Sequence, residues 1–365
     1  MSGIWGEYLK ISLFGESHGP AVGVVIDGLP AGIEISEEEI QRELDRRAPG
    51  KSKLVTARRE PDKFEILSGV FQNKTSGTPL CAVIFNRDRR SRDYEELKDI
   101  VRPGHADYTA RIKYSGFNDY RGGGHFSGRL TAPLVFAGAI AKGILKQKEI
   151  YVGSHLASIG GIEDELFNPV DIRADLLLNL NAQEMPLLKK ELEALITEKI
   201  LEVKADSDSV GGIVETAVIG LQPGLGSPFF DSVESKIAHL IFSIPAVKGL
   251  EFGAGFRFGS LKGSQANDPF YWEEGKVKTK TNNCGGILGG ITNGMPVIFR
   301  TAFKPTPSIG QTQETVDLAK KENTLLSIRG RHDPCLVLRA IPVVEALSSL
   351  AVVEMIIEKE GKTWF

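Results

Sequence analysis

Apolar residues along this chain form short runs typical of strands and longer stretches typical of helices. In the first half, the runs 22–26 and 80–85 predict strands. A helix is expected between them, because Ser36 followed three residues later by Glu39 is a helix-capping signature. The apolar stretch 134–145 predicts a second, buried helix. The pattern therefore predicts a protein of mixed α and β structure.

The second half of the chain repeats this order. Strands are predicted at 212–219 and 297–299, and helices at about 231–242 and 343–357. Turn residues recur at one constant offset: Gly69, Thr75, Gly77 and Pro79 match Gly286, Thr292, Gly294 and Pro296. We interpret the repetition as an internal duplication within a single domain, 1–365, whose halves lie at about 1–148 and 208–365. Chance similarity among glycine-rich hairpins is the alternative interpretation.

The segment between the halves, about 149–207, has a different pattern. Residues 184–201 are charged, with leucines and isoleucines at helical spacing, and predict an exposed amphipathic helix. Such a helix would pack on another element or on a partner subunit. Two similar halves would also direct their turn loops toward a shared seam, where ligand sites are common.

Composition limits the choice of partners and compartment. The net charge of −3 argues against a general nucleic-acid or membrane-surface binder. The longest apolar stretch, 130–145, is too short to span a bilayer and is broken by Pro133 and Lys142. The three cysteines have neither metal-ligand spacing nor a disulfide pattern. We therefore predict a cytoplasmic protein without a metal site.

Two histidines in glycine-containing loops are the first candidates for chemistry. His18 lies in the segment 15–19, Gly-Glu-Ser-His-Gly, and His105 lies in 102–107, Arg-Pro-Gly-His-Ala-Asp. Histidine exchanges protons near neutral pH, and glycine allows a ligand to approach the backbone closely. Together the two loops indicate acid–base chemistry on a small anion, although each histidine alone is better explained by a structural turn or by core packing.

Further segments offer anion-binding groups. The glycines of 121–129 precede a helix, so their N–H groups, with Arg129, can hold an anion. The loop 304–309 offers a lysine and two hydroxyls between prolines, and fits either a phosphate or a plain turn. Asp333 is either an ion-paired structural residue or a positioned base. Arg46, Arg47 and Lys53 mark either a solvated helix end or a loop that closes over an anionic substrate.

Taken together, these segments make the chain closely similar to the chorismate synthase family. The standard phosphate-loop and dinucleotide-binding patterns, by contrast, are incomplete. The matching segments follow the family order along the chain: 14–19, 45–47, 58–62, 68–71, 102–108, 119–124, 137–142 and 330–334.

The resemblance implies a fold and a reaction. The fold is an α+β sandwich with helices between two antiparallel sheets, built as a duplication and assembled as a homotetramer. The activity is that of a carbon–oxygen lyase that converts 5-enolpyruvylshikimate 3-phosphate to chorismate and phosphate by a 1,4-elimination. Reduced FMN is the implied cofactor, and its electrons come either from NADPH bound by the enzyme or from an outside reductant. The alternative function is a non-catalytic anion- or nucleotide-binding protein.

The resemblance also implies residue roles. His18, with Ser17 beside it, would protonate the departing phosphate, His105 would protonate reduced FMN near N1, and Asp333 would assist removal of the C6 proton. Contacts to substrate or NADP phosphate would come from Arg47 and Lys53, with Arg129 as a further anion contact. The implied flavin contacts are His125, Phe126, Ser127, Pro245, Ala246, Gly289, Lys304, Pro305, Thr306, Pro307, Ser308 and Arg331. Positions 125, 126 and 245 depart from the common family pattern.

Overall fold

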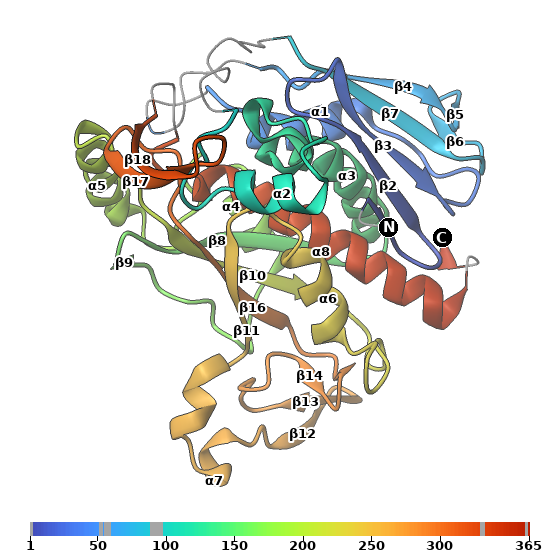
Figure 1. Cartoon of the computed structure of the whole chain (residues 1–365). Helices are drawn as coiled ribbons and strands as arrows, with labels where there is room; N and C mark the ends of the chain where they lie inside the picture. Colours follow the sequence, from blue (N-terminus) through green and yellow to red (C-terminus); the bar gives the residue numbers. More distant parts are fainter. Residues whose placement is uncertain (1–2, 51–53, 55–59, 88–97, 329–332, 362–363) are drawn as a thin grey trace.

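A computed structural model describes residues 3–50, 54, 60–87, 98–328, 333–361 and 364–365 (Figure 1). Its core contains two five-stranded antiparallel sheets. Sheet 1 has the order β1-β2-β3-β7-β4 and sheet 2 the order β11-β16-β10-β8-β9. The strands of sheet 1 are β1 (Ile4–Trp5), β2 (Lys10–Gly15), β3 (Ala21–Asp27), β7 (Leu80–Phe85) and β4 (Phe64–Ser68). Those of sheet 2 are β11 (Val247–Phe252), β16 (Val297–Phe303), β10 (Gly212–Ile219), β8 (Tyr151–Ile159) and β9 (Ile162–Glu163).

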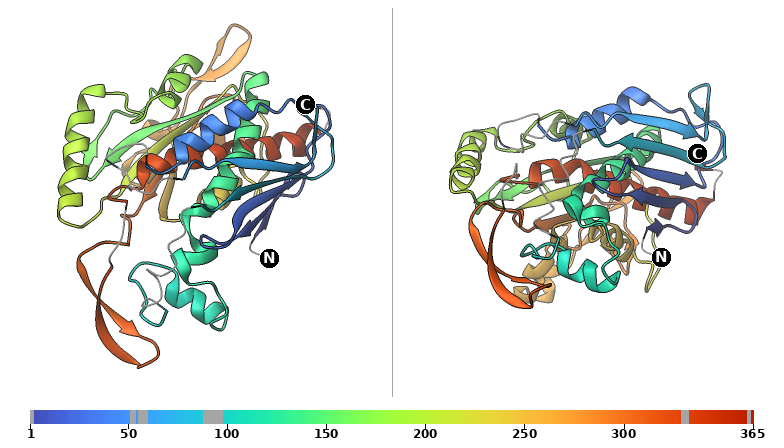
Figure 2. Two further views of the ribbon diagram at one scale, coloured as in Figure 1. Left: turned by 90° about the horizontal axis from the view of Figure 1, so that it is seen from above. Right: turned by 45° about the horizontal axis from the view of Figure 1, so that its top comes forward.

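Helices fill the space between the sheets, as Figures 1 and 2 show. Helix α3 (Thr131–Gln147) packs mainly on sheet 1, α8 (Val337–Glu360) packs mainly on sheet 2, and the two helices pack on each other. Helix α1 (Glu37–Arg47) packs on both, and α6 (Val233–Ile241) packs on α8. The predicted cap of α1 is present, because the Ser36 side chain accepts the N–H of Glu39 at 3.2 Å. The predicted sandwich of helices between two antiparallel sheets is confirmed.

The two halves share hydrogen bonds as well as strand order. Each half has a short hairpin, β5 (Val70–Phe71) with β6 (Lys74–Thr75) and β14 (Ile287–Leu288) with β15 (Ile291–Thr292). In each hairpin a threonine hydroxyl accepts one backbone N–H at 2.9 Å and donates to one backbone carbonyl. These bonds join Ile33, Thr75 and Pro30 in one half and Leu225, Thr292 and Gln222 in the other. The equivalence supports the duplication, while the limits proposed for each half stay a prediction.

The closest approach in the helical layer is between α3 and α8. A Cβ atom added to Gly138 would lie 2.2 Å from the Cβ of Ala346. Two small residues therefore let the helix backbones meet, and side chains of both helices reach the core on either side. The helical stretches Gly128–Gln147 and Val337–Glu360 are long and apolar enough to cross a membrane, but 83% and 100% of their most apolar windows are buried inside this fold. They are the core helices of the sandwich.

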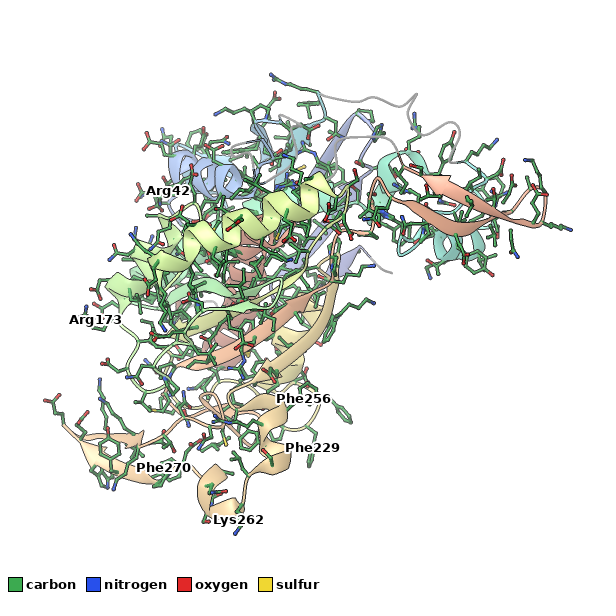
Figure 3. The ribbon with its side chains drawn as sticks, turned by 90° about the vertical axis from the view of Figure 1, so that its left-hand side faces the viewer. Arg42, Arg173, Phe229, Phe256, Lys262 and Phe270 are labelled. Atoms are coloured by element: carbon green, nitrogen blue, oxygen red, sulfur yellow. The ribbon has the colours of Figure 1, made fainter. Side chains whose placement is uncertain are left out.

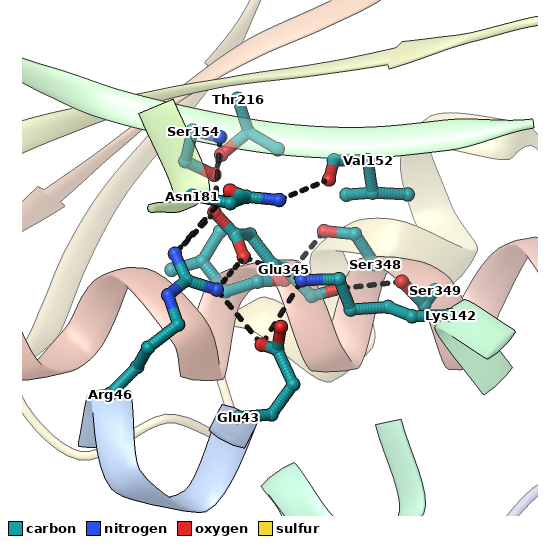
Figure 4. Close-up of polar contacts among 11 residues, drawn as sticks. Glu43, Arg46, Lys142, Val152, Ser154, Asn181, Thr216, Glu345, Ser348 and Ser349 are labelled. Carbon is teal, nitrogen blue, oxygen red and sulfur yellow. Dashed lines mark hydrogen bonds and ion pairs between the residues drawn. The ribbon is translucent and has the colours of Figure 1, made fainter. Parts of the chain in front are cut away.

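A buried charge cluster ties the same helices to sheet 2 (Figure 4). The Glu345 carboxylate of α8 accepts hydrogen bonds from Arg46 at 2.6 Å, from Lys142 at 2.9 Å and from the N–H of Ser154 at 3.1 Å. Arg46 and Lys142 also contact Glu43, at 2.8 and 3.1 Å. Burial opposes ionisation of Glu43, but the attraction of Lys142 and Arg46 outweighs it and holds the pKa at about 2. The cluster pairs two acids with two bases and links α1, α3, α8 and β8.

The segment between the halves contains α4 (Ala174–Asn181), the 3-10 turn η4 (Lys190–Leu192) and α5 (Glu193–Ala205). The predicted helix over 184–201 is therefore wrong in its first part. Pro186 interrupts the helical pattern, and its carbonyl accepts the N–H of Leu156. The Asp164 carboxylate then accepts the N–H groups of Leu188 and Lys189, at 2.7 and 3.0 Å. These bonds hold the segment before η4 in a non-helical conformation.

The remaining elements lie around the sandwich. The 3-10 turns η2 (Arg121–Phe126) and η3 (Gly128–Leu130) contact sheet 1, and α2 (Asp107–Lys113) precedes them in the chain. A separate two-stranded ribbon is formed by β17 (Thr312–Asp317) and β18 (Glu322–Ser327). A lower lobe, residues 226–232 and 253–292, contains η5 (Gly255–Ser260), α7 (Gly263–Ala266), β12 (Phe270–Glu273) and β13 (Lys276–Thr279) beside the β14–β15 hairpin (Figure 1).

The helix contact gives a stability prediction. Gly138→Ala should destabilise the fold by about 1–3 kcal/mol, because its methyl group would force α3 and α8 apart. Gly143→Ala is the matched control in the same helix: its Cβ would meet nothing within 4 Å, so it should stabilise by up to about 1 kcal/mol. Urea unfolding of both variants measures the difference, and equal stability of the two would contradict the packing argument.

Candidate active site

The His18 loop joins two central strands of sheet 1. It runs from the end of β2 at Gly15 to the start of β3 at Ala21. The N–H of Gly19 donates to the Glu16 carbonyl at 3.0 Å and closes a tight turn. Ser17 and His18 are both buried, although they lie in a loop. The loop therefore presents them to neighbouring protein segments rather than to open solvent.

The glycine run of η2 covers this loop. The N–H of Ser17 donates to the Gly124 carbonyl at 3.1 Å. Gly122 has a φ of 59°, and a Cβ atom there would lie 2.5 Å from Nε2 of His18. Only glycine lets the backbone approach the imidazole this closely. Beside the run, a hydrogen bond from Arg121 lowers the pKa of Asp119. Gly122 therefore fixes one side of the His18 imidazole.

Two predicted anion-binding arginines are buried beside the loop and paired with acids. Arg47 is only 2% exposed and contacts Asp62 at 2.8 Å. Arg129 contacts Glu60 at 2.8 Å and also the other oxygen of Asp62. Burial opposes ionisation of Asp62, but both arginines outweigh it and lower its pKa. Burial lowers the pKa of Arg47 to about 10, and its guanidinium stays charged at neutral pH.

This pairing decides one alternative left by the sequence. Arg47 does not belong to a solvated helix end, and neither does Arg46, which lies in the buried charge cluster. Both guanidinium groups of the Arg47–Arg129 pair already have carboxylate partners. Direct contact of Arg47 and Arg129 with substrate stays a prediction. Lys53, predicted to act with Arg47, lies outside the described residues.

The His105 loop meets the predicted flavin loop of the second half. His105 Nε2 lies 2.7 Å from the Ser308 hydroxyl, and Lys304 Nζ donates to the Gly104 carbonyl at 2.6 Å. The N–H of Lys304 donates to the Ala246 carbonyl at 3.0 Å. Three segments that lie far apart in the sequence are thus brought together. Burial lowers the pKa of Lys304, and Lys248 adds to the effect.

The His105 loop is held in shape by an internal ion pair. The Arg102 guanidinium donates to both oxygens of Asp107, each at 2.7 Å. Burial opposes ionisation of Asp107, but the bonds from Arg102 outweigh it and lower its pKa. Asp107 also begins α2, so the pair fixes the loop to a helix. The geometry presents His105 to Ser308 rather than leaving it as a free turn residue.

The other predicted flavin contacts are spread around these two loops. The ring nitrogen Nδ1 of His125 lies 2.9 Å from the Gly15 carbonyl. The Phe126 ring lies 6.1 Å from that of Tyr114, and the Ser127 hydroxyl accepts the N–H of Arg129. Thr306 has a buried hydroxyl oxygen without a hydrogen-bond partner among the described residues. Such an oxygen is suited to a bound ligand.

The remaining predicted contacts are less closely tied to the site. Pro305 and Pro307 flank Thr306, and Pro245 is exposed before Ala246. Gly289 lies in the turn of the β14–β15 hairpin, where the space around it is open. Arg331 lies outside the described residues.

Asp333 is connected to Arg47 through the side chain of Arg339. Its carboxylate pairs with Arg339 at 2.5 Å, and Arg339 Nε donates to the Arg47 carbonyl at 3.1 Å. Asp333 and Arg47 are therefore connected through one guanidinium group. This is the ion-paired arrangement that the sequence left open, and the role of Asp333 as a positioned base stays a prediction.

Sequence reasoning missed several residues that organise the site. Glu60 and Asp62 lie within the matching segment at 58–62, but no role was predicted for them. No role was predicted for Asn86 or Arg339 either. Asn86 was recognisable as a polar residue placed directly after the apolar strand β7. The partners of the buried acids could not be recognised from the sequence, since Asp62 pairs with arginines 15 and 67 residues away.

The described residues thus include two histidine loops, a carboxylate paired with Arg339 and two arginines paired with acids, and comparisons with known proteins relate the chain to one family. A family model described as chorismate synthase matches residues 9–357. The chorismate synthase of Thermococcus kodakarensis is 50% identical over 358 residues, 98% of each chain. That of Korarchaeum cryptofilum is 48% identical over 353 residues, 97% of each chain. A crystal structure of chorismate synthase has a TM-score of 0.77 at 32% identity, covering 98% of this chain and 94% of the other.

The contact between Gly122 and His18 can be tested with a matched pair of glycines. Gly122 and Gly123 both have positive φ, 59° and 84°, so alanine at either should cost about 1–2 kcal/mol of strain. Only at 122 would the added methyl group meet the imidazole. We expect Gly122→Ala to shift the imidazole NMR signals of His18, assigned with His18→Gln, and Gly123→Ala to leave them in place. Unchanged signals in Gly122→Ala would show that the contact is absent.

Proposed function

Because this chain belongs to the chorismate synthase family, we propose that its two histidine loops catalyse the 1,4-elimination of phosphate from 5-enolpyruvylshikimate 3-phosphate. The products are chorismate and inorganic phosphate. The observation that carries the proposal is the arrangement of His18 and His105, each fixed by a second segment of the chain. A binding protein would need no such control of two proton-exchanging groups, so the non-catalytic alternative is not supported.

Different residues would serve different steps of the elimination. In the reaction the bond between carbon 3 and the phosphate oxygen breaks, and carbon 6 loses a proton. His18 would supply a proton from its imidazole to the departing phosphate, with the Ser17 hydroxyl beside it. Asp333, held by Arg339, would orient the acceptor of the C6 proton. Arg47 and Arg129 would contact the anionic groups of the substrate, as the family resemblance implies. His105, held at Nε2 by Ser308, would keep a proton available at the cofactor edge.

The cofactor we propose is reduced FMN. The buried hydroxyl of Thr306, which has no hydrogen-bond partner among the described residues, fits an anionic, hydrogen-bonding ligand together with the Lys304 ammonium group and the Ser308 hydroxyl. Pro245, Ala246 and the backbone of 125–127 would contact the same ligand, as would Gly289 and Arg331. When bound, reduced flavin supplies electron density transiently to the substrate, and the overall reaction is redox-neutral. NADPH and an outside reductant are the two proposed electron sources.

We further propose that the chain acts in the cytoplasm as a homotetramer. The lower lobe carries exposed aromatic side chains, of which Phe229, Phe230 and Phe256 are 88–90% exposed. Figure 3 shows Phe229, Phe256 and Phe270 on this lobe. Apolar side chains grouped on one part of a surface are typical of subunit contacts. A second copy of the chain would cover them.

The function is tested under anaerobic conditions. Purified protein, chemically reduced FMN and 5-enolpyruvylshikimate 3-phosphate should release phosphate and form chorismate in equal amounts, whereas oxidised FMN should give neither. Replacing chemical reduction by NADPH then decides between the two electron sources. Folded, flavin-binding protein that forms no product would refute the lyase assignment.

Variants in the same assay test the histidines. His18→Ala and His105→Ala should each lower kcat about a hundredfold or more, because each removes an acid–base group. His239→Gln, on the exposed side of α6, is the control and should leave kcat unchanged. Loss of stability without loss of turnover would mean that the histidines are structural.

The assembly is tested by light scattering. Wild-type protein should have the mass of four chains, and Phe229→Ser with Phe256→Ser should lower that mass. Phe71→Ser, at an exposed aromatic in the first half, is the matched control and should not. A monomeric wild-type protein would contradict the tetramer, and an intact tetramer in the double variant would place the contact elsewhere.

A further inference from the structure

Asn86 connects the His18 loop to Arg129. It follows β7 directly and is only 3% exposed. Its Nδ2 group donates to the carbonyls of Glu16 and Gly19, both at 3.0 Å, and its Oδ1 atom accepts from Arg129 Nε at 2.9 Å. The two carbonyls flank Ser17 and His18 on either side. One side chain therefore holds both ends of the turn that carries His18.

The chemistry of this position requires an amide. Two donors must point at two carbonyl oxygens while one acceptor faces a guanidinium group, and asparagine has that combination. A carboxylate would still accept from Arg129 but would set its second oxygen against two carbonyl oxygens. An apolar side chain would remove the hydrogen bonds to both carbonyls and would leave the buried Nε–H of Arg129 without this acceptor, which costs about 1–3 kcal/mol.

The other face of the loop is fixed by different groups. Gly122 lies against the His18 imidazole, and the Gly124 carbonyl accepts the N–H of Ser17. Asn86 acts from the carbonyl side of the turn, and its own N–H donates to the Pro20 carbonyl at 3.0 Å. Arg129 is in turn fixed by Glu60 and Asp62. The amide thus sets the distance between the histidine loop and a guanidinium group that is itself held rigidly.

We propose that Asn86 is a positioning residue for phosphate loss, which acts by aligning His18 with Arg129. The inference rests on the proposed function, in which His18 protonates the leaving group. A small displacement of a catalytic group lowers a rate strongly, and about 1 Å is enough for a hundredfold loss. Asn86 does not contact the substrate in this proposal, so its whole effect passes through the position of His18 relative to Arg129.

The second half of the fold offers a matched control. Asn282 is also 3% exposed, and its Nδ2 group donates to the carbonyls of Pro169 and Pro296, both at 2.9 Å. Its Oδ1 atom accepts the N–H of Gly286 at 2.6 Å. It is the same residue with the same hydrogen-bond pattern and burial, but it holds a hairpin of the second half. Substitution there removes comparable stability without reaching the His18 loop.

The first experiment compares single-turnover rates at saturating reduced FMN and 5-enolpyruvylshikimate 3-phosphate. Asn86→Asp and Asn86→Ala should each lower the rate of phosphate release about a hundredfold. Asn282→Asp and Asn282→Ala should stay within about threefold of wild type, at similar losses of unfolding free energy. If Asn86→Asp does not fold, Asn86→Ala alone decides, since water can occupy the smaller site. A rate for Asn86→Ala within threefold of wild type would overturn the proposal.

A double-mutant comparison separates positioning from stability. In a His18→Gln background, Asn86→Ala should lower the remaining rate by less than about threefold, because the group it aligns is already missing. A full further hundredfold loss would show that Asn86 acts independently of His18, and the proposal would be wrong.

Imidazole NMR gives a readout that needs no turnover. Asn86→Ala should shift the His18 signals, and Asn282→Ala should not. If wild-type protein forms no chorismate, the proposed function fails, while this NMR comparison still shows whether Asn86 positions His18. Unshifted His18 signals in Asn86→Ala would refute the positioning role.

Discussion

The site depends on the pairing of buried arginines with buried carboxylates. Asp62 lies between Arg47, at the end of α1, and Arg129, just before α3. A buried charge without its partner is strongly destabilising, so these segments can close over the core only together. Arginine suits this position because its planar group serves several acceptors at once. Arg47 also donates to Thr131 at 3.1 Å, while its carbonyl accepts from Arg339. The starts of both long core helices are thereby fixed to one helix end.

The duplication explains why the site draws on both halves. Arg129 comes just before α3, and Arg339 lies in the first turn of α8, which is the counterpart of α3 in the second half. Because α3 and α8 pack on each other through Gly138 and Ala346, their starts are held in a fixed relation. The equivalent hairpins keep their structural threonines, but the surrounding loops have diverged. His18 belongs to the first half, whereas Ser308 and Lys304, which hold the His105 loop, belong to the second.

The sequence predicted the elements better than their contacts. The cap at Ser36, the core helices and the duplicated strands follow from local patterns and are confirmed. The helix expected over 184–201 was wrong at its start because a proline and the distant Asp164 carboxylate override the apolar spacing. His105 and Ser308 are 203 residues apart, and only the folded chain shows that they meet. Resemblance to a family supplied the residue roles, but it did not indicate that Arg47 and Arg129 are already paired.

That pairing bears on how the site handles a highly charged substrate. Arginines held by Glu60 and Asp62 need no ligand to be stable, so the protein can fold with buried cations before substrate arrives. Each arginine already has a carboxylate partner, so in the proposed function the two would hold a phosphate group less tightly than unpaired arginines would. Catalysis gains only from interactions that strengthen as charge develops on the leaving group. In the proposed function, a proton from His18, held by Gly122 on one side and by the Asn86-anchored turn on the other, would meet that requirement better than a permanently unpaired arginine would.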